Sequence, residues 1–224
     1  MAERGRLCKI DLRLHIETKS KILVLGSSHA RRMFEHMKNS AQYSEYELDH
    51  MTMPGADMAR LAAHWPHDKV SQMSSHDVLT IQALGNDLFQ KGTHFITRNP
   101  KKIHLRSFDP TAHDEFAKSC LILESLIKGI APKILILDNV FRHLCGCPEH
   151  QYPGLISHQV QANKILRRTL RSSARIISTD TLIAEEGTHR KVSVGDRANW
   201  LIDAVHLKPV FYQRVIERLL PMLH

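Results

Sequence analysis

Short runs of apolar residues alternate along this chain with longer segments in which apolar side chains recur every three or four residues. Short apolar runs between turn residues are typical of buried β-strands, and the longer spacing is typical of amphipathic helices. The pattern predicts strands at residues 22–25, 46–53, 78–84, 133–138 and 175–179. It predicts helices at residues 29–38, 56–65, 111–130, 155–172 and 209–220. This alternation indicates an α/β fold of three layers, α/β/α, around a central, mostly parallel five-stranded sheet of the flavodoxin-like kind.

The rest of the pattern concerns domain organisation. The chain has 224 residues and shows no internal repeat and no linker-like segment, so we expect one domain over residues 21–224. Residues 1–20 mix charges with a short apolar alternation and are expected to form an N-terminal arm or an added edge strand. Residues 89–110 and 141–154 lack a clear period and are expected to be loops over one end of the sheet.

Charge and cysteine content narrow the class of protein. The net charge of +8 permits attraction to an acidic partner such as nucleic acid. The four cysteines are too few and too unevenly spaced for a disulfide scaffold, and Cys120, in an apolar helical segment, is expected to be a buried free thiol. We find no signal-peptide pattern and no apolar run near the roughly 18 residues that span a bilayer. These features predict a cytoplasmic protein without membrane contact, with the nucleus as an alternative location.

The segment KILVLGSSHARRM, residues 21–33, predicts a strand, a tight turn and the first residues of a helix. A serine in such a turn lies at the carboxyl edge of the sheet, where open α/β folds bind ligands. The backbone N–H groups that begin the helix lack intrahelical acceptors and can stabilise an anion there. The alternative interpretation is that Ser27 or Ser28 only caps the helix.

Three further polar motifs follow predicted strands: Pro54-Gly55, Gly85-Asn86-Asp87 and Asp203-x-x-His206. Each has a purely structural explanation, because the first two have turn compositions and the third permits local side-chain pairing. Taken together and in this order, they resemble the motifs of the SGNH (GDSL-like) hydrolase superfamily of esterases and lipases.

This resemblance implies a serine esterase with a catalytic triad. Ser28 would be the nucleophile, His206 the general base and Asp203 the residue that orients the histidine. The oxyanion hole would consist of the backbone N–H groups of Ser28 and Gly55 and the side-chain amide of Asn86. The expected reaction is hydrolysis of an ester, a thioester or an acetyl group, without a cofactor.

The sequence departs from the family pattern at three positions. Ser27 replaces the usual aspartate before the nucleophile, and Leu84 stands where the family prefers a glycine. Leu207 follows His206 where many members carry proline. None of these changes removes a reacting atom, and the change at Ser27 affects the shape of the turn most.

A different class of function stays open, namely a catalytically weak or inactive domain that binds RNA or a protein partner. The SGNH-like domain of Oskar and the esterase domains of ORF1 proteins of LINE-type retrotransposons offer distant similarities of this kind. The candidate nucleic-acid contacts are basic residues near the fifth predicted strand: Lys164, Arg167, Arg168, Arg171 and Arg175. Such a face is alternatively a solvated charged surface. The enzyme interpretation is favoured because every catalytic position is filled.

Four residues of metal-ligand type occur in the second predicted loop: His143, Cys145, Cys147 and His150. Their spacing matches no standard zinc pattern, so we expect no metal there. Both predicted loops are polar and basic and contain no long apolar lid. This composition favours a small, polar or anionic ester over the substrate of a true lipase.

Overall fold

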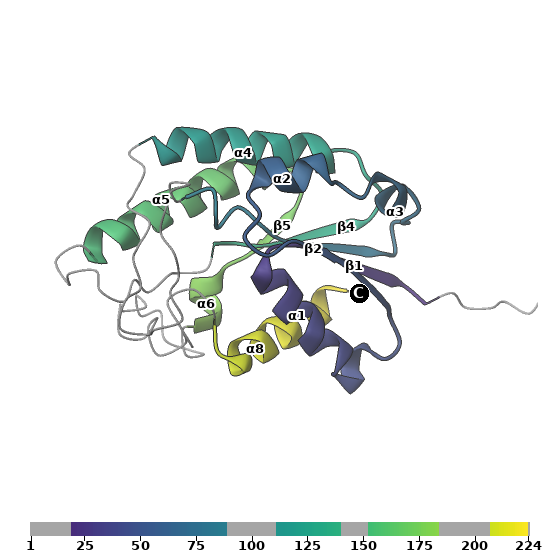
Figure 1. The fold of residues 1–224 in the computed structure, drawn as a ribbon. Helices are drawn as coiled ribbons and strands as arrows, with labels where there is room; N and C mark the ends of the chain where they lie inside the picture. Colours follow the sequence, from purple (N-terminus) through teal and green to yellow (C-terminus); the bar gives the residue numbers. More distant parts are fainter. Residues whose placement is uncertain (1–18, 89–110, 140–151, 184–206, 224) are drawn as a thin grey trace, which may run out of the picture.

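The computed structural model describes residues 19–88, 111–139, 152–183 and 207–223 (Figure 1). A five-stranded parallel sheet, with strand order β2-β1-β3-β4-β5, forms the centre of these residues. Its strands are β1 (Lys21–Gly26), β2 (Glu47–Thr52), β3 (Val78–Gln82), β4 (Lys133–Leu137) and β5 (Arg175–Ile177). The predicted α/β fold with a five-stranded sheet is therefore confirmed, and all the strand pairs described are parallel.

Helices cover both faces of the sheet (Figure 1). One face carries α1 (Ser28–Lys38) and α8 (Pro209–Leu219), and the other carries α2 (Met58–Ala63), α4 (Ala112–Ile127) and α5 (Tyr152–Leu170). Shorter elements are α3 (His67–Ser71), α6 (Thr179–Ile183) and the 3₁₀ turns η1 (Ala41–Tyr43) and η3 (Leu220–Met222). None of the helices in these described ranges is both long and apolar enough to cross a membrane.

The predicted elements agree with the observed ones to within a few residues at their ends, and two short helices were missed. Helix α6 begins at Thr179, the last residue of the fifth predicted strand, and α3 was not predicted at all. A five-residue helix is too short to display a helical period, so the pattern could not reveal either one. Helix α5 begins three residues earlier than predicted, at Tyr152. The expected N-terminal arm and most of the two expected loops lie outside the described residues.

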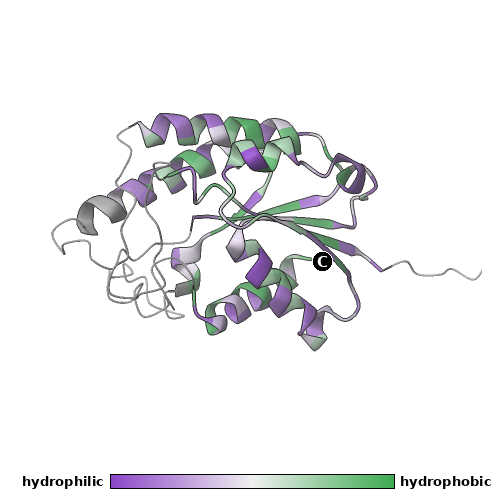
Figure 2. Cartoon of the chain, in the orientation of Figure 1, coloured by the Kyte–Doolittle hydropathy of each residue, from purple (hydrophilic) through white to green (hydrophobic). Residues whose placement is uncertain are grey.

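The core is mostly aliphatic, with a few buried aromatic rings, and lies on both sides of the central strands. Every residue of β3 is buried, and in β1 only Lys21 is not, because both faces of these strands are covered by helices. Figure 2 shows hydrophobic residues along the strands and polar residues on the outer surfaces of the helices. Strand β2 is the sheet edge beside β1 and is largely exposed, with acidic side chains that discourage edge-to-edge pairing. Cys120 in α4 is a buried free thiol, as predicted, and burial raises its pKa to about 12.

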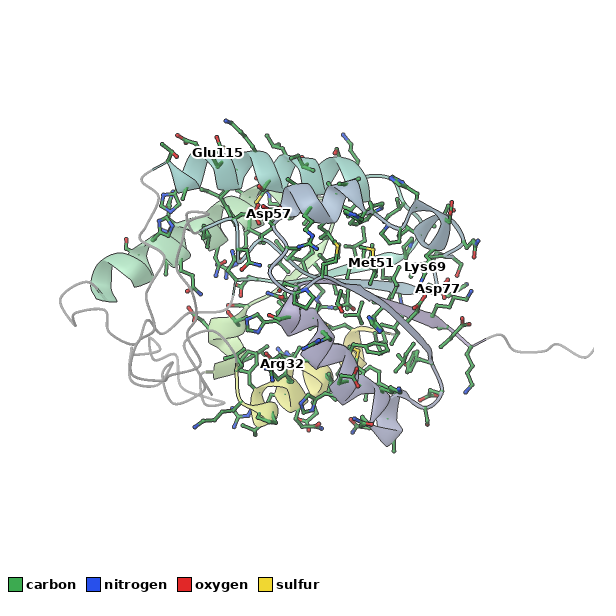
Figure 3. The ribbon with its side chains drawn as sticks, in the orientation of Figure 1. Arg32, Met51, Asp57, Lys69, Asp77 and Glu115 are labelled. Carbon is green, nitrogen blue, oxygen red and sulfur yellow. The ribbon has the colours of Figure 1, made fainter. Side chains whose placement is uncertain are left out.

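Asp77 fastens the amino edge of the sheet, opposite the end at which Asp57 begins α2 (Figure 3). Its carboxylate accepts hydrogen bonds from the backbone N–H of Lys21 at 2.7 Å and of Ser74 at 2.6 Å, and its carbonyl accepts one from Lys133 N–H at 2.9 Å. Although burial acts to raise it, the hydrogen bonds that Lys21 and Ser74 donate to the carboxylate hold the pKa of Asp77 below its ordinary value. The starts of β1, β3 and β4 are thereby held together.

The opposite, carboxyl edge depends on Gly26, the last residue of β1. Its φ of +140° is a conformation that residues with side chains rarely adopt. A Cβ atom at this position would lie 1.8 Å from the carbonyl oxygen of Gln82 in β3. The backbones of β1 and β3 therefore approach each other so closely that only glycine fits.

We expect Gly26→Ala to be severely destabilising, by more than about 4 kcal/mol, which is exceptional for one substitution. The control is Gly129→Ala, because Gly129 also has a positive φ, of +77°, but an added Cβ there would meet no described heavy atom within 4 Å. That control should cost only about 1–2 kcal/mol of backbone strain. Urea unfolding of both variants measures the difference, and equal losses of stability would contradict the steric argument.

Leu84 is the one non-glycine residue with positive φ in the described part of the chain, at +73°, and its side chain is buried. This is the position where the resembling family prefers glycine. The left-handed conformation explains that preference, and the buried leucine side chain offsets the backbone strain in this protein.

We expect the Leu84→Gly variant to be more stable to unfolding than the Leu84→Ala variant, by about 1 kcal/mol, because only glycine relieves the backbone strain. The usual order at ordinary φ is the reverse, with glycine worse by roughly 0.5–1 kcal/mol. Both variants should be less stable than the wild type, since deleting a buried leucine costs about 2–5 kcal/mol. Urea midpoints for Leu84→Gly and Leu84→Ala provide the comparison, and an alanine variant as stable as the glycine variant would refute it.

Candidate active site

The carboxyl ends of three adjacent strands stop at the same level. Gly26 pairs in register with Thr52 on β2 and with Gln82 on β3. Ser28 follows the first strand by two residues, while Gly55 and Asn86 come three and four residues after the other two. The structure thus places all three candidate residues at one edge of the sheet. They lie around the end of β1, the strand at which the strand order reverses. Open α/β folds bind their ligands at this point.

Ser28 is the first residue of α1 and is partly exposed. Ser27, the residue before it, has an extended backbone, and its side chain makes no capping hydrogen bond. Instead the Ser27 hydroxyl donates to Oε1 of Gln82 at 2.8 Å, and the Ser27 N–H donates to the Gln82 carbonyl at 3.0 Å. Ser27 therefore occupies the N-cap position without capping the helix through its side chain, and its hydrogen bonds to Gln82 fix the turn that presents Ser28.

Gln82 is a residue of this site that sequence reasoning missed. It is 1% exposed, and it holds Ser27 through both its side chain and its backbone. The available signal was a polar residue at the end of an otherwise apolar strand. Gln82 also explains how the turn is held with a serine where the resembling family has aspartate.

Gly55 lies in a tight turn directly after β2. The N–H of Met53 donates to the carbonyl of Gly26 at 2.8 Å, and the N–H of Ala56 donates back to the Met53 carbonyl at 3.0 Å. Within this turn Pro54 precedes Gly55, whose φ of +75° is typical of the third residue of a type II turn. Glycine is required here by conformation and not by crowding, because a Cβ on Gly55 would meet no described atom within 4 Å.

Asn86 connects the turn after β3 with the turn that holds Gly55. Its side-chain amide donates to the carbonyl of Ala56 at 2.8 Å, and Ala56 is the residue directly after Gly55. The two turns that carry candidate oxyanion donors are therefore joined by a hydrogen bond from one of those candidates.

Asp87 ties the same two segments together a second time. Both of its carboxylate oxygens lie 3.1 Å from the N–H of Met58 at the start of α2. The hydroxyl of Ser119 in α4 donates to the same carboxylate at 2.8 Å. Sequence analysis quoted Asp87 only as part of a motif, whereas the structure shows it anchoring α2 and α4 to the turn after β3.

The other two members of the proposed triad, Asp203 and His206, lie outside the described residues. The described chain resumes at Leu207, which is buried, and α8 begins two residues later at Pro209. Helix α8 packs against α1, the helix that begins with Ser28.

The five basic candidates for nucleic-acid contact are all exposed, but one of them is committed elsewhere. Arg167 donates to the Asp138 carboxylate at 2.6 Å and lies 3.3 Å from the hydroxyl of Ser178. Of the five, it alone has an acidic partner among the residues described. Arg167 thus has a structural role that the charge pattern did not reveal.

Asp138 follows β4 at the same edge of the sheet and is fully buried. Besides the Arg167 guanidinium, the N–H and the hydroxyl of Thr179 each donate to it at 2.7 Å. Burial raises the pKa of Asp138 above its ordinary value, although the hydrogen bonds from Thr179 and the charge of Arg167 act in the opposite direction. This cluster joins β4, α5 and the start of α6.

The histidine- and cysteine-containing segment from His143 to His150 lies outside the described residues. Within the ranges that the structure does describe, no group of three or more His, Cys, Asp or Glu side chains could hold a metal ion. The expected absence of a metal stays a prediction.

Comparison with known proteins concerns the fold. No protein-family profile matches the sequence, and no curated protein matches it by sequence. Solved structures do match. The α/β hydrolase LAE5 from the metagenome of Lake Arreo, Spain, is 14% identical, with 91% of this chain and 94% of that chain covered and a TM-score of 0.60. The acetylxylan esterase Axe2 from Geobacillus stearothermophilus is 13% identical over the same shares, also with a TM-score of 0.60.

A GDSL-like lipase from Bacteroides thetaiotaomicron is 10% identical, with 92% of this chain and 90% of that chain covered and a TM-score of 0.59. These neighbours share the architecture described above along nearly the whole chain. The protein has the fold of the SGNH (GDSL-like) hydrolases.

Proposed function

We propose that this protein is a serine hydrolase of the SGNH type that cleaves a small polar ester, a thioester or an acetyl group. The observation that carries the proposal is the placement of Ser28, Gly55 and Asn86 at one edge of the sheet, in hydrogen-bonded turns. The fold shared with esterases supports the reaction class.

In the proposed reaction, the Ser28 hydroxyl attacks the acyl carbon while His206 takes the proton. His206 then gives the proton to the leaving alcohol or thiol, and water hydrolyses the acyl-enzyme in a second round. Asp203 keeps His206 in the correct tautomer and stabilises its protonated form. All bonds are made and broken by side chains and water, so the chemistry requires no cofactor.

The oxyanion of each tetrahedral intermediate would be stabilised by the N–H of Ser28, the N–H of Gly55 and the side-chain amide of Asn86. Ser28 is the first residue of α1, where backbone N–H groups have no intrahelical acceptor. The positive end of the helix dipole adds to the attraction. The hydrogen bond from Asn86 to Ala56 holds the Gly55 turn in place before substrate binds, which avoids reorganisation during the reaction.

An acetyl ester is the first substrate to test. One structural neighbour is an acetylxylan esterase, and no described atom would lie within 4 Å of a Cβ on Gly55, which is compatible with close approach of a small acyl group. The polar, basic composition of residues 89–110 further favours a polar alcohol part.

The central test is hydrolysis of 4-nitrophenyl acetate, together with labelling by a fluorophosphonate probe. We expect Ser28→Ala and His206→Ala each to abolish most activity, and the double variant to lose little more, because the two residues act as a unit. Asn86→Ala should keep probe labelling while slowing turnover by about 10²–10³-fold. A free imidazole loses its proton at about pH 6.5. Because the proposed base must be unprotonated, the rate of ester hydrolysis by the wild type should rise through neutral pH.

Ser125→Ala is the matched control, because Ser125 is an exposed serine on α4 whose hydroxyl donates only to the carbonyl of Ile122 within its own helix. It should react with the probe and hydrolyse the ester like the wild type. Activity or labelling that survives Ser28→Ala would show that the chemistry lies elsewhere, or that the domain only binds.

A second candidate function rests on exposed basic residues of α5 and of the segment that follows it, up to the start of β5. We propose that Lys164, Arg168, Arg171 and Arg175 contact the phosphates of RNA weakly. Helix α5 contains no acidic residue along its whole length. In the described residues these four cations have no acidic partner, unlike Arg167, so their charges are available to an external polyanion.

RNA binding through four phosphate contacts to a single strand should weaken roughly 50-fold between about 50 and 200 mM salt, because each contact releases counterions. Arg168→Glu with Arg171→Glu should abolish binding. Lys38→Glu with Arg218→Glu changes the net charge by the same amount but on α1 and α8, which lie across the sheet from α5. This control should retain most of the RNA binding. Fluorescence anisotropy with a labelled oligonucleotide makes the comparison. Affinity insensitive to salt, or equally reduced in both double variants, would exclude this surface.

A further inference from the structure

A buried polar contact joins the two helices on one face of the sheet, next to the proposed nucleophile. His29 directly follows Ser28 in α1 and is 4% exposed. Its Nδ1 atom lies 2.8 Å from the hydroxyl oxygen of Tyr212 in α8, and the two groups share a hydrogen bond. Tyr212 is itself 1% exposed, and the ring of His36, two turns along α1, stacks on it at 5.6 Å between ring centroids.

The same two helices adjoin the proposed nucleophile and the proposed base in the sequence. Helix α1 begins with Ser28, and α8 begins at Pro209, three residues after His206. Tyr212 lies in the first turn of α8, at the end nearest His206 in the sequence. The contact between His29 and Tyr212 therefore joins the neighbour of one reacting residue to the helix that follows the other.

We propose that His29 and Tyr212 are positioning residues, which fix the start of α8 against the start of α1 and thereby hold Ser28 relative to the helix that follows His206 in the sequence. This inference rests on the function proposed above and adds two residues to it. Neither residue touches substrate or a reacting atom. A nucleophile and its base must be held within a fraction of an ångström of the productive geometry, so a small displacement of α8 would reduce the rate.

The simpler explanation is that this hydrogen bond only satisfies buried polar groups of the core. The chain provides a control that separates the two explanations. Tyr43, also 1% exposed, donates its hydroxyl to the carbonyl of Ile216, one turn further along the same helix. Both tyrosines thus fasten α8 through a buried hydroxyl, but only Tyr212 does so next to the proposed site.

The test compares Tyr212→Phe with Tyr43→Phe, each of which removes one hydroxyl and keeps the ring. We expect Tyr212→Phe to lower kcat for 4-nitrophenyl acetate about tenfold, with KM within about twofold, and to slow fluorophosphonate labelling in parallel. Tyr43→Phe should leave kcat within about twofold of the wild type. Thermal unfolding should show a similar fall in Tm for both variants, by about 2–4 °C.

A second pair of variants tests the histidine. His29→Asn keeps a polar atom near the position of Nδ1 and should retain at least half of the wild-type kcat, whereas His29→Ala should match Tyr212→Phe. Combining His29→Ala with Tyr212→Phe should cost little more than either change alone, because both remove the same hydrogen bond.

The outcomes distinguish this inference from the function on which it rests. If the wild type labels at Ser28 but the two tyrosine variants lose kcat equally, or neither loses it, the positioning role is wrong and the hydrolase proposal stands. If the wild type neither labels at Ser28 nor hydrolyses the ester, both are overturned. A tenfold effect confined to Tyr212→Phe, with equal Tm losses, supports the inference.

Discussion

The close approach of β1 and β3 at Gly26 is the constraint on which the rest of the described site depends. With no side chain at Gly26, the Ser27 N–H reaches the Gln82 carbonyl at 3.0 Å, and the Met53 N–H reaches the Gly26 carbonyl at 2.8 Å. These two hydrogen bonds extend the pairing of three strands by one residue beyond the sheet. Because β1, β2 and β3 then end at the same level, the turns that follow them lie together at the carboxyl edge of the sheet, where α1 begins.

A layer of side-chain hydrogen bonds is built on this backbone frame. Asn86 and Asp87 fasten the turn after β2 to the turn after β3, and Asp138 fastens β4 to α5 and α6. The partners in each case are far apart in sequence, and most are backbone N–H or carbonyl groups. Such bonds orient donors before any ligand arrives, since buried polar groups in a low-dielectric surrounding hold their partners firmly.

Local patterns were sufficient for the fold and insufficient for much of the site. The apolar run of β4 and the period of α4 identify those elements directly, because burial on both faces or on one stripe leaves a mark in the sequence. Motif order located Ser28, Gly55 and Asn86, and the roles given to them remain proposals. The hydrogen bonds of Gln82 with Ser27 and of Arg167 with Asp138 join residues whose proximity exists only in three dimensions. The structural role of Arg167 and the support of the Ser28 turn were therefore overlooked.

The pairing of α1 with α8 has a consequence for the order in which this chain can fold during its synthesis. Helix α1 emerges from the ribosome long before α8, and its apolar face includes Met33 and Met37, which are almost fully buried in the finished protein. Helix α8 packs beside it, and Tyr212 of α8 is translated 183 residues after its α1 partner His29. Until then the nascent chain can pair its strands but must carry an uncovered hydrophobic surface, which is the kind of surface that chaperones bind. Full packing of this face has to wait until α8 has been synthesised.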